Sequence, residues 1–198
     1  SADLVPLVAD AYSPEGMHAA REMARVRVHD GAVRGVAVHP NAERVASVGA
    51  DGNVCVVAVD LTRRVVKFRH TRTANEPMGV RSCAWNADGT QLVTGGDDGC
   101  ARTWTVDARS GSLLQTYSST LDRNTHQRHA LAAVAFVGAS ICAASWSGSV
   151  FAFDGKRVRE LPLDDGWCVA MSAAERVLAV ASRTAVRLIY VPDAPQQL

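Results

Sequence analysis

Hydrophobic and polar residues alternate in short runs along most of the chain, and turn-forming residues separate the runs. The segments GVAVHP, RVASVG and VCVVAV, between residues 35 and 59, are rich in β-branched side chains and bounded by Gly, Asn and Asp. This pattern is typical of strands joined by tight turns. Residues 13–24 differ, because they begin with Ser, Pro and Glu, which are typical of the start of a helix. The end of this segment also alternates between polar and apolar residues, as a strand would. The pattern predicts an all-β fold.

Similar sequence motifs recur along the chain. VRGVAVHPNAERVAS begins at Val33, VRSCAWNADGTQLVT at Val80 and LAAVAFVGASICAA at Leu131, and GWCVAMSAAERVLAVAS is a more divergent fourth copy. Each of the first three is followed by a turn and a further strand, as in DDGCARTWTV. A repeat of about 35–50 residues is typical of a repeat architecture. We therefore interpret ADG and DDG as hairpin turns, in which Gly tolerates positive φ and Asp bonds nearby backbone.

The first two copies resemble the WD-repeat family of β-propellers. Residues 29–57 follow the family pattern without a gap, and the second copy carries Thr94, Asp98 and Trp104 at family positions. The resemblance implies radially packed, four-stranded antiparallel blades of about 40–45 residues. It places four blades within residues 22–192, after a leader (1–21) that could end a preceding blade and before a tail (193–198). The blades are expected at about residues 22–60, 61–107, 108–154 and 155–192.

The number of blades is low for a propeller of this family. Because such propellers commonly have about seven blades, we expect the C-terminal part of a larger propeller. The missing blades would come from the same polypeptide or from a partner chain. The alternative is a closed four-bladed ring, in which residues 23–28 pair with residues 186–191.

The resemblance also implies a set of residues that brace each blade. In the family, His, Ser or Thr, Asp and Trp form a hydrogen-bonded network, and buried polar groups of this kind need such partners. The first blade has Val57 where Trp would stand, and the third has Ser147 and Phe153 at network positions. The bracing residues carried over are His29, Ser47, Asp51, His70, Thr94, Asp98 and Trp104.

A partner-binding face follows from the same resemblance. In the family, partners bind on one face of the propeller. Three positions in each blade point to that face: the two that flank the first apolar residue of the inner strand, and the one before the turn. Trp and Arg are enriched at binding hot spots. The alternative is that the two tryptophans pack beneath the connections 71–79 and 118–129. The candidates are Arg34, Arg81, Asp97, Trp146 and Trp167.

Composition narrows the class of protein. The hydrophobic share is 47%, the net charge is +1, and no apolar run approaches the roughly 18 residues of a membrane span. Five cysteines, an odd number without a Cys-x-x-Cys pair, favour reduced thiols and an intracellular location, cytoplasmic or nuclear. A basic run is expected to be an outer edge strand, or alternatively an RNA phosphate track. Its charged residues are Arg63, Arg64, Lys67, Arg69 and Arg72.

Candidate chemistry is sparse. GGDDG lacks the spaced ligands of a calcium loop, and His126 and His129 lack a second ligand pair for zinc. The sequence has no Gly-x-Ser-x-Gly elbow and no Gly-Lys-Ser/Thr phosphate loop. We therefore expect no catalytic site, metal or cofactor. The expected function is a non-catalytic scaffold or adaptor of a multiprotein complex, with an RNA- or ribonucleoprotein-associated propeller as the alternative.

Overall fold

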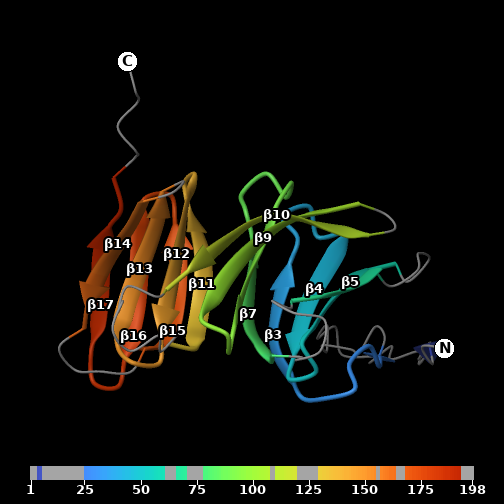
Figure 1. The fold of residues 1–198 in the computed structure, drawn as a ribbon. Coiled ribbons are helices and arrows are strands. Elements are labelled where there is room, and N and C mark those ends of the chain that lie inside the picture. The colour runs from blue at the N-terminus through green and yellow to red at the C-terminus, as the bar shows by residue number, and fades with distance from the viewer. Residues whose placement is uncertain are drawn as a thin grey trace, which may run out of the picture.

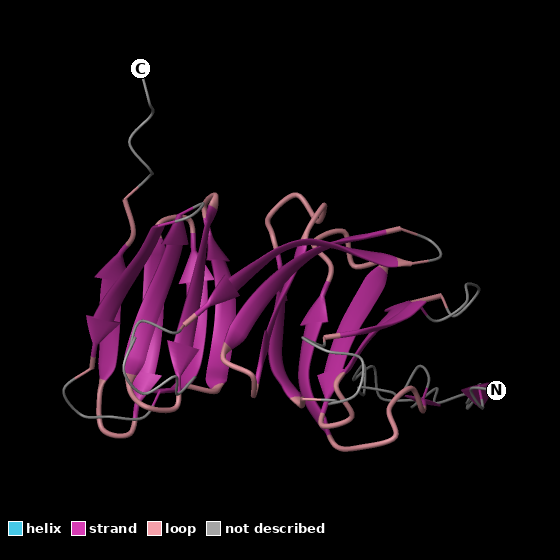
Figure 2. Cartoon of the chain, viewed as in Figure 1, coloured by secondary structure: helices cyan, strands magenta, loops and turns pink. Residues whose placement is uncertain are grey.

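Every described element of the chain is a β-strand (Figure 2). The structure, a computed structural model, describes residues 4–5, 25–60, 66–70, 78–107, 110–119, 129–154, 157–163 and 168–192. The expected all-β propeller architecture is confirmed. The ambiguous stretch 13–24 lies outside the described residues. No helix in the described part of the chain is long and apolar enough to cross a membrane.

Four antiparallel sheets follow one another in chain order, from the blue sheet to the red sheet of Figure 1. Blade 1 is β3–β6, blade 2 is β7–β10, blade 3 is β11–β14, and blade 4 has the three strands β15–β17. In each blade neighbouring strands are consecutive in sequence, as tight turns require. A separate pair, β1 (Leu4–Val5) and β2 (Arg25–Val26), precedes blade 1.

The fourth strand of each of the first three blades lies beyond the point where the sequence placed the end of that blade. In blade 1 the strands are β3 (Val33–Val38), β4 (Arg44–Gly49), β5 (Asn53–Ala58) and β6 (Val66–Arg69). In blade 2 they are β7 (Val80–Trp85), β8 (Leu92–Gly96), β9 (Cys100–Val106) and β10 (Gly111–Ser118). In blade 3 they are β11 (Leu131–Val137), β12 (Ser140–Ser145), β13 (Ser149–Asp154) and β14 (Arg157–Pro162). Blade 4 contains β15 (Cys168–Ala174), β16 (Val177–Ser182) and β17 (Val186–Tyr190).

The turn between the second and third strands is the same in three blades. Gly52, Gly99 and Gly148 have φ of 73°, 69° and 87°, respectively. Residues with a Cβ are disfavoured in this left-handed region, which explains the repeated glycine. Asp51 and Asp98 each precede one of these glycines, as the sequence predicted. Blade 4 has no glycine in its corresponding turn.

Apolar side chains pack between consecutive blades. One cluster joins blades 1 and 2 around Val48, Leu92 and Trp104, and others join blades 2 and 3 and blades 3 and 4. The middle strands are buried on both faces, so they are apolar almost throughout rather than alternating. Removing this apolar surface from water is the main source of stability between blades.

The outermost faces of the described sheets expose apolar side chains. Val36 and Val38 of blade 1 are 63% and 59% exposed, and Leu188 of blade 4 is 74% exposed. The alternative ring closure by residues 23–28 is not found among the described residues, where β2 pairs with β1 and β17 pairs only with β16.

Candidate functional site

A repeated irregularity in the first strand of each blade aims side chains at one face. The pairing shifts between Val33 and Gly35, between Val80 and Ser82, and at the matching points of β11 and β15. One residue per blade is therefore left without a partner across the strand pair, and such bulges redirect a side chain. In blades 1 and 2 that residue is Arg34 and Arg81, respectively. The hydrophobic pattern alone does not reveal this shift.

Arg34 reaches from blade 1 to blade 2. Its Nη1 donates to Asp97 Oδ2 over 2.8 Å, and about a third of its side chain is exposed. The backbone of Asp97 is held by a bond from its N–H to the carbonyl of Gly79 (2.8 Å). A Cβ on Gly79 would lie 2.5 Å from Arg34 Nη1 and 2.6 Å from Asp97 Oδ2. Only glycine leaves room for this ion pair.

Arg81 extends the arrangement to blade 3. Its Nε donates to the other carboxylate oxygen of Asp97, Oδ1, and its guanidinium carbon lies 5.1 Å from the ring centroid of Trp146. That distance is within the range of cation–π attraction. Trp146 is 39% exposed. Its backbone N–H donates to the carbonyl of Ala130 (3.1 Å), as the backbone N–H of Asp97 donates to the carbonyl of Gly79.

Four of the five predicted partner residues therefore meet. Arg34, Arg81, Asp97 and Trp146, named here the bulge-face cluster, come from three consecutive blades. Two guanidinium groups share one carboxylate beside a partly exposed indole, so the cluster has a formal charge of +1. It offers hydrogen-bond donors and an aromatic surface to solvent.

The fifth residue, Trp167, lies outside the described residues. The register of blade 4 also corrects the equivalence that selected it. Cys168 pairs with Ser182 as Val33 pairs with Gly49, so residue 169 corresponds to Arg34. By the same register, exposed Arg183 occupies the position before the turn. Without the turn glycine, the divergent fourth copy offered no anchor for the correct alignment.

The predicted bracing residues of blade 2 form a buried network. His70 Nδ1 lies 2.8 Å from Thr94 Oγ1, which also accepts a 2.8 Å bond from Trp104 Nε1. His70 Nε2 lies 3.3 Å from Asp98 Oδ1. His70 and Thr94 are fully buried, and the network joins the connection before β7 to strands β8 and β9.

Arg102 is a member of this network that the sequence reasoning missed. Its Nη1 lies 2.6 Å from His70 Nε2 and pairs with Asp98 Oδ2 (2.7 Å), with only 3% of its side chain exposed. The signal was its position two residues before Trp104, which places both on one face of a strand. Burial would raise the pKa of Asp98, but the bond with His70 and the charge of Arg102 lower it to about 2.

Blade 1 has a related network without an arginine. His29 Nδ1 lies 3.0 Å from Asp51 Oδ1, and its Nε2 lies 2.9 Å from Ser47 Oγ. Asp51 also accepts bonds from Asn53 Nδ2 (2.7 Å) and from two backbone N–H groups, those of Asp30 and Asn53. Although burial opposes ionisation, these bonds hold the pKa of Asp51 well below its usual range.

In blades 3 and 4 the hydrogen-bonded histidine network is replaced, fully or in part, by apolar packing. The N–H of His70 bonds the carbonyl of Gly52, as that of Ser119 bonds Gly99 and that of Leu163 bonds Gly148. The histidine position is therefore Ser119 for blade 3 and buried Leu163 for blade 4. Blade 3 retains a Ser145–Ser147 hydrogen bond of 2.9 Å.

The basic run is described only in part. Val66 is buried and Phe68 half-buried, while Lys67 and Arg69 are exposed on β6, the alternation expected of an outer strand. Lys67 Nζ lies 3.6 Å from Asp30 Oδ2. The remaining members, Arg63, Arg64 and Arg72, lie outside the described residues. No group of three or more potential metal ligands occurs among the residues that the structure places.

Comparison with known proteins identifies the repeats. Residues 21–57 and 67–105 match the family "WD domain, G-beta repeat". The chain is a WD-repeat β-propeller of about four blades. Each match ends at or next to the tryptophan position of the network, Val57 in blade 1 and Trp104 in blade 2.

Further relatives of this WD-repeat propeller agree with the fold. A segment of 88 residues is 38% identical to the ribosome biogenesis protein ERB1 of Malassezia globosa, covering 40% of this chain and 10% of that protein. The computationally designed Ika4 protein matches with a TM-score of 0.62 at 18% identity, covering 84% of this chain and 95% of the other. The β-propeller domain of Myceliophteria thermophila Cps50 (Swd1) matches with a TM-score of 0.69 at 15% identity, covering 86% and 55%. The structural matches support the fold alone.

Proposed function

We propose that this WD-repeat propeller is a non-catalytic scaffold that binds a partner protein through the bulge-face cluster. The observation that carries the proposal is the convergence of Arg34, Arg81, Asp97 and Trp146 from three blades. Rigid strands and repeated bulges position these side chains, so little conformational freedom is lost when a partner binds. Partly exposed Trp and Arg residues are typical hot-spot residues.

The partner is expected to be a protein or peptide that packs on Trp146 and offers acceptors to the two arginines. The similarity to a ribosome biogenesis protein makes an assembly of that process the first place to search for it. Such an assembly fits the expected intracellular location, as do the five buried cysteines, none of which forms a disulfide.

Substitution of Trp146 tests the proposal. Proteins retained by the wild-type chain are compared with those retained by Trp146→Ala, and each one lost is purified and its Kd measured directly. Truncation of a central hot-spot residue weakens binding by about 2 kcal/mol or more. Leu113→Ala is the control, because Leu113 is likewise an exposed apolar residue (51% exposed) but lies on β10, outside the cluster. Wild-type affinity of the Trp146→Ala chain for every partner, with its melting temperature unchanged, would refute the proposal.

An alternative is RNA binding along β6. Lys67 and Arg69 are exposed on one strand, which gives two adjacent cationic side chains for phosphates. A Lys67→Glu and Arg69→Glu double substitution would then abolish salt-dependent binding to homopolymer RNA. The same substitution would leave the protein partner of the bulge-face cluster bound, which separates the two functions.

A further inference from the structure

The face that carries the bulge-face cluster continues onto blade 4. By strand register, Arg183 stands in blade 4 where Trp146 stands in blade 3 and Asp97 in blade 2. Arg183 is exposed at the tip of the hairpin that joins β16 to β17, which is closed by a bond from the N–H of Ser182 to the carbonyl of Ala185 (2.9 Å). Together with the bulge arginine of blade 2, this face presents basic, aromatic and basic side chains on blades 2, 3 and 4.

The repeat explains why Arg183 lacks an acidic neighbour. Asp97 is contacted by the bulge arginines of its own blade and of the preceding blade, so the contacts of this position come from those two blades. At the corresponding bulge positions for Arg183 the sequence has Val169 and Ala132, and neither is charged. The ion pairs found among the described residues involve other cations, so the charge of Arg183 is uncompensated there.

The guanidinium group of Arg81 is held with its terminal end open. Its Nε donates to Asp97 Oδ1, and its guanidinium carbon lies 5.1 Å from the ring centroid of Trp146. Asp97 therefore occupies the Nε edge, while the two terminal nitrogens have no hydrogen-bond partner within the described part of the chain. About a third of the side chain is exposed. Two parallel N–H groups of a guanidinium match the two oxygens of a carboxylate, which gives a strong and directional contact.

The charge of this face favours an acidic partner. Arg34 and Arg81 share the single negative charge of Asp97, which leaves +1 on the cluster, and Arg183 adds a second positive charge. Opposite charges across an interface speed association and select the partner. Other described carboxylates in the loops of this face already have partners within the chain: Asp30, Asp51 and Asp98.

We propose that the partner segment bound by this face is an acidic peptide in which carboxylates flank an apolar side chain. One carboxylate binds the terminal nitrogens of Arg81, the apolar side chain packs on Trp146, and the second carboxylate binds Arg183. The inference rests on the proposed function and names the chemistry of its partner. A nucleic acid fits less well, because Asp97 would repel a continuous phosphate track and a single indole offers one base-stacking platform where single-strand binders use several.

A set of fluorescein-labelled peptides tests the inference, with binding to the whole chain followed by anisotropy. Each peptide has a Gly-Ser frame and one Phe with a Glu on either side, separated from it by one, two or three residues. We expect saturable binding for at least one separation, weakened about tenfold or more when both Glu residues are replaced by Gln. Added salt should weaken binding of the Glu peptide more than that of the Gln peptide.

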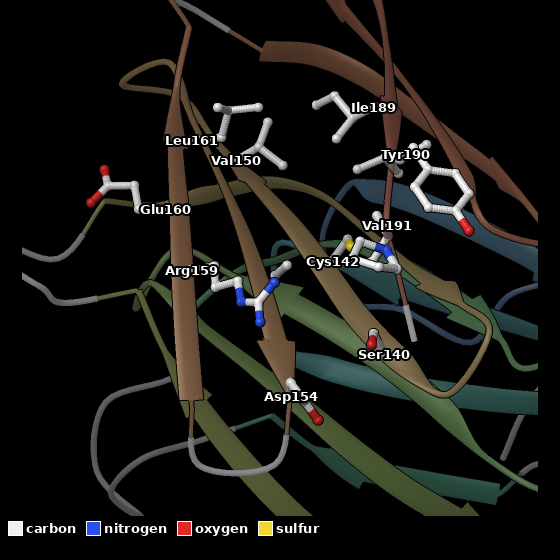
Figure 3. Close-up of a pocket in the computed structure, with 13 residues that line it drawn as sticks. Ser140, Cys142, Val150, Asp154, Arg159, Glu160, Leu161, Ile189, Tyr190 and Val191 are labelled. Atoms are coloured by element: carbon white, nitrogen blue, oxygen red, sulfur yellow. The ribbon is translucent and has the colours of Figure 1, made fainter. Parts of the chain in front are cut away.

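Charge reversal of Arg183 provides the second arm. Arg183→Glu should weaken binding about tenfold or more, because repulsion replaces attraction. Arg159→Glu is the matched control and should bind as wild type, because it changes the net charge equally at an exposed arginine of β14. Arg159 lines the cavity between β14 and β17, away from the bulge-face cluster (Figure 3). Arg81→Lys keeps the charge but loses the planar pair of N–H groups, so binding should weaken about tenfold.

Trp146→Ala separates this inference from the function on which it rests, because it removes no charge. If Trp146→Ala weakens binding while the Gln peptides bind as tightly as the Glu peptides, or while Arg183→Glu behaves as Arg159→Glu does, the binding face stands and the acidic partner is wrong. Wild-type affinity of a folded Trp146→Ala chain would remove the proposed function and this inference together. Absence of saturable binding up to about 1 mM at every separation, or displacement of the peptide by poly(U) RNA, would also overturn the inference.

Discussion

The ion pair of Asp98 and Arg102 offers the sharpest test of how blade 2 is held together. Both side chains are almost completely buried, and the only histidine in the network, His70, shares the same hydrogen bonds. Asp98→Asn leaves Arg102 as a buried charge without its anionic partner. Breaking a buried pair in this way costs about 3–5 kcal/mol of unfolding free energy. The same contacts lower the pKa of Asp98 to about 2, which corresponds to stabilisation of the fold by its ionised form of about 2–3 kcal/mol.

The interaction itself is isolated by a double-mutant cycle. Arg102→Ala removes the cation, so the subsequent Asp98→Asn change should cost much less than it does in the wild-type chain. We expect a coupling of about 2 kcal/mol or more, measured by urea unfolding followed by tryptophan fluorescence. The changes in side-chain volume caused by each substitution occur on both sides of the cycle, so they largely cancel in the coupling energy.

Blade 1 supplies the matched control. Cys55 stands at the position of Arg102, four residues after the turn aspartate, and Asp51 has only neutral or histidine partners. The cycle of Asp51→Asn with Cys55→Ala should therefore show coupling within about 0.5 kcal/mol of zero. Equal coupling in the two blades, or coupling below about 0.5 kcal/mol in blade 2, would refute the role assigned to Arg102.

Three further predictions concern the buried networks of blades 1 and 2. Burial, reinforced by the charge of Arg102, lowers the pKa of His70, so the folded state resists its protonation. The free energy of unfolding should therefore fall as pH drops below about 6.5. His70→Gln should reduce this dependence of unfolding free energy on pH, measured by urea titrations at several pH values. Below about pH 4 a second loss should follow, because the folded state keeps Asp51 and Asp98 ionised through their lowered pKa values while the unfolded chain takes up protons on them. Trp104→Phe removes the donor to Thr94 Oγ1 while the bond with His70 remains, so the expected cost is about 1–2 kcal/mol, and a denaturation midpoint equal to wild type would contradict this.

The parts of the fold that could be predicted are those specified by local chemistry. Short apolar, β-branched runs bounded by turn residues identified the strands, and the Asp-Gly turns identified the hairpins because only glycine readily tolerates their positive φ. His70 was assigned to the network although its connection to β7 is longer than that of His29 to β3. The longer connection does not matter, because the N–H of His70 is tied to Gly52 of the preceding blade.

The parts that could not be predicted depend on register. The bulges that expose Arg34 and Arg81 leave the hydrophobic alternation almost unchanged, so they are invisible without the strand pairing. The burial of Arg102 could not be predicted either, since it depends on Asp98 and His70 surrounding the guanidinium group. The position of Arg183 likewise requires the register of blade 4, which only the pairing of β15 with β16 shows.

The adjacent aspartates of the DDG turn connect stability to the proposed binding surface. Asp98 points inward, where its Oδ1 accepts the N–H of Cys100 (3.1 Å) and its carboxylate joins the buried network. Asp97 points outward and joins Arg34 to Arg81. Because neighbouring residues of one turn share a backbone, the network that fixes Asp98 also fixes the position of Asp97. The buried ion pair thereby preorganises the cluster on the opposite side of the same turn. Loosening Asp98 should therefore weaken partner binding even where the chain remains folded.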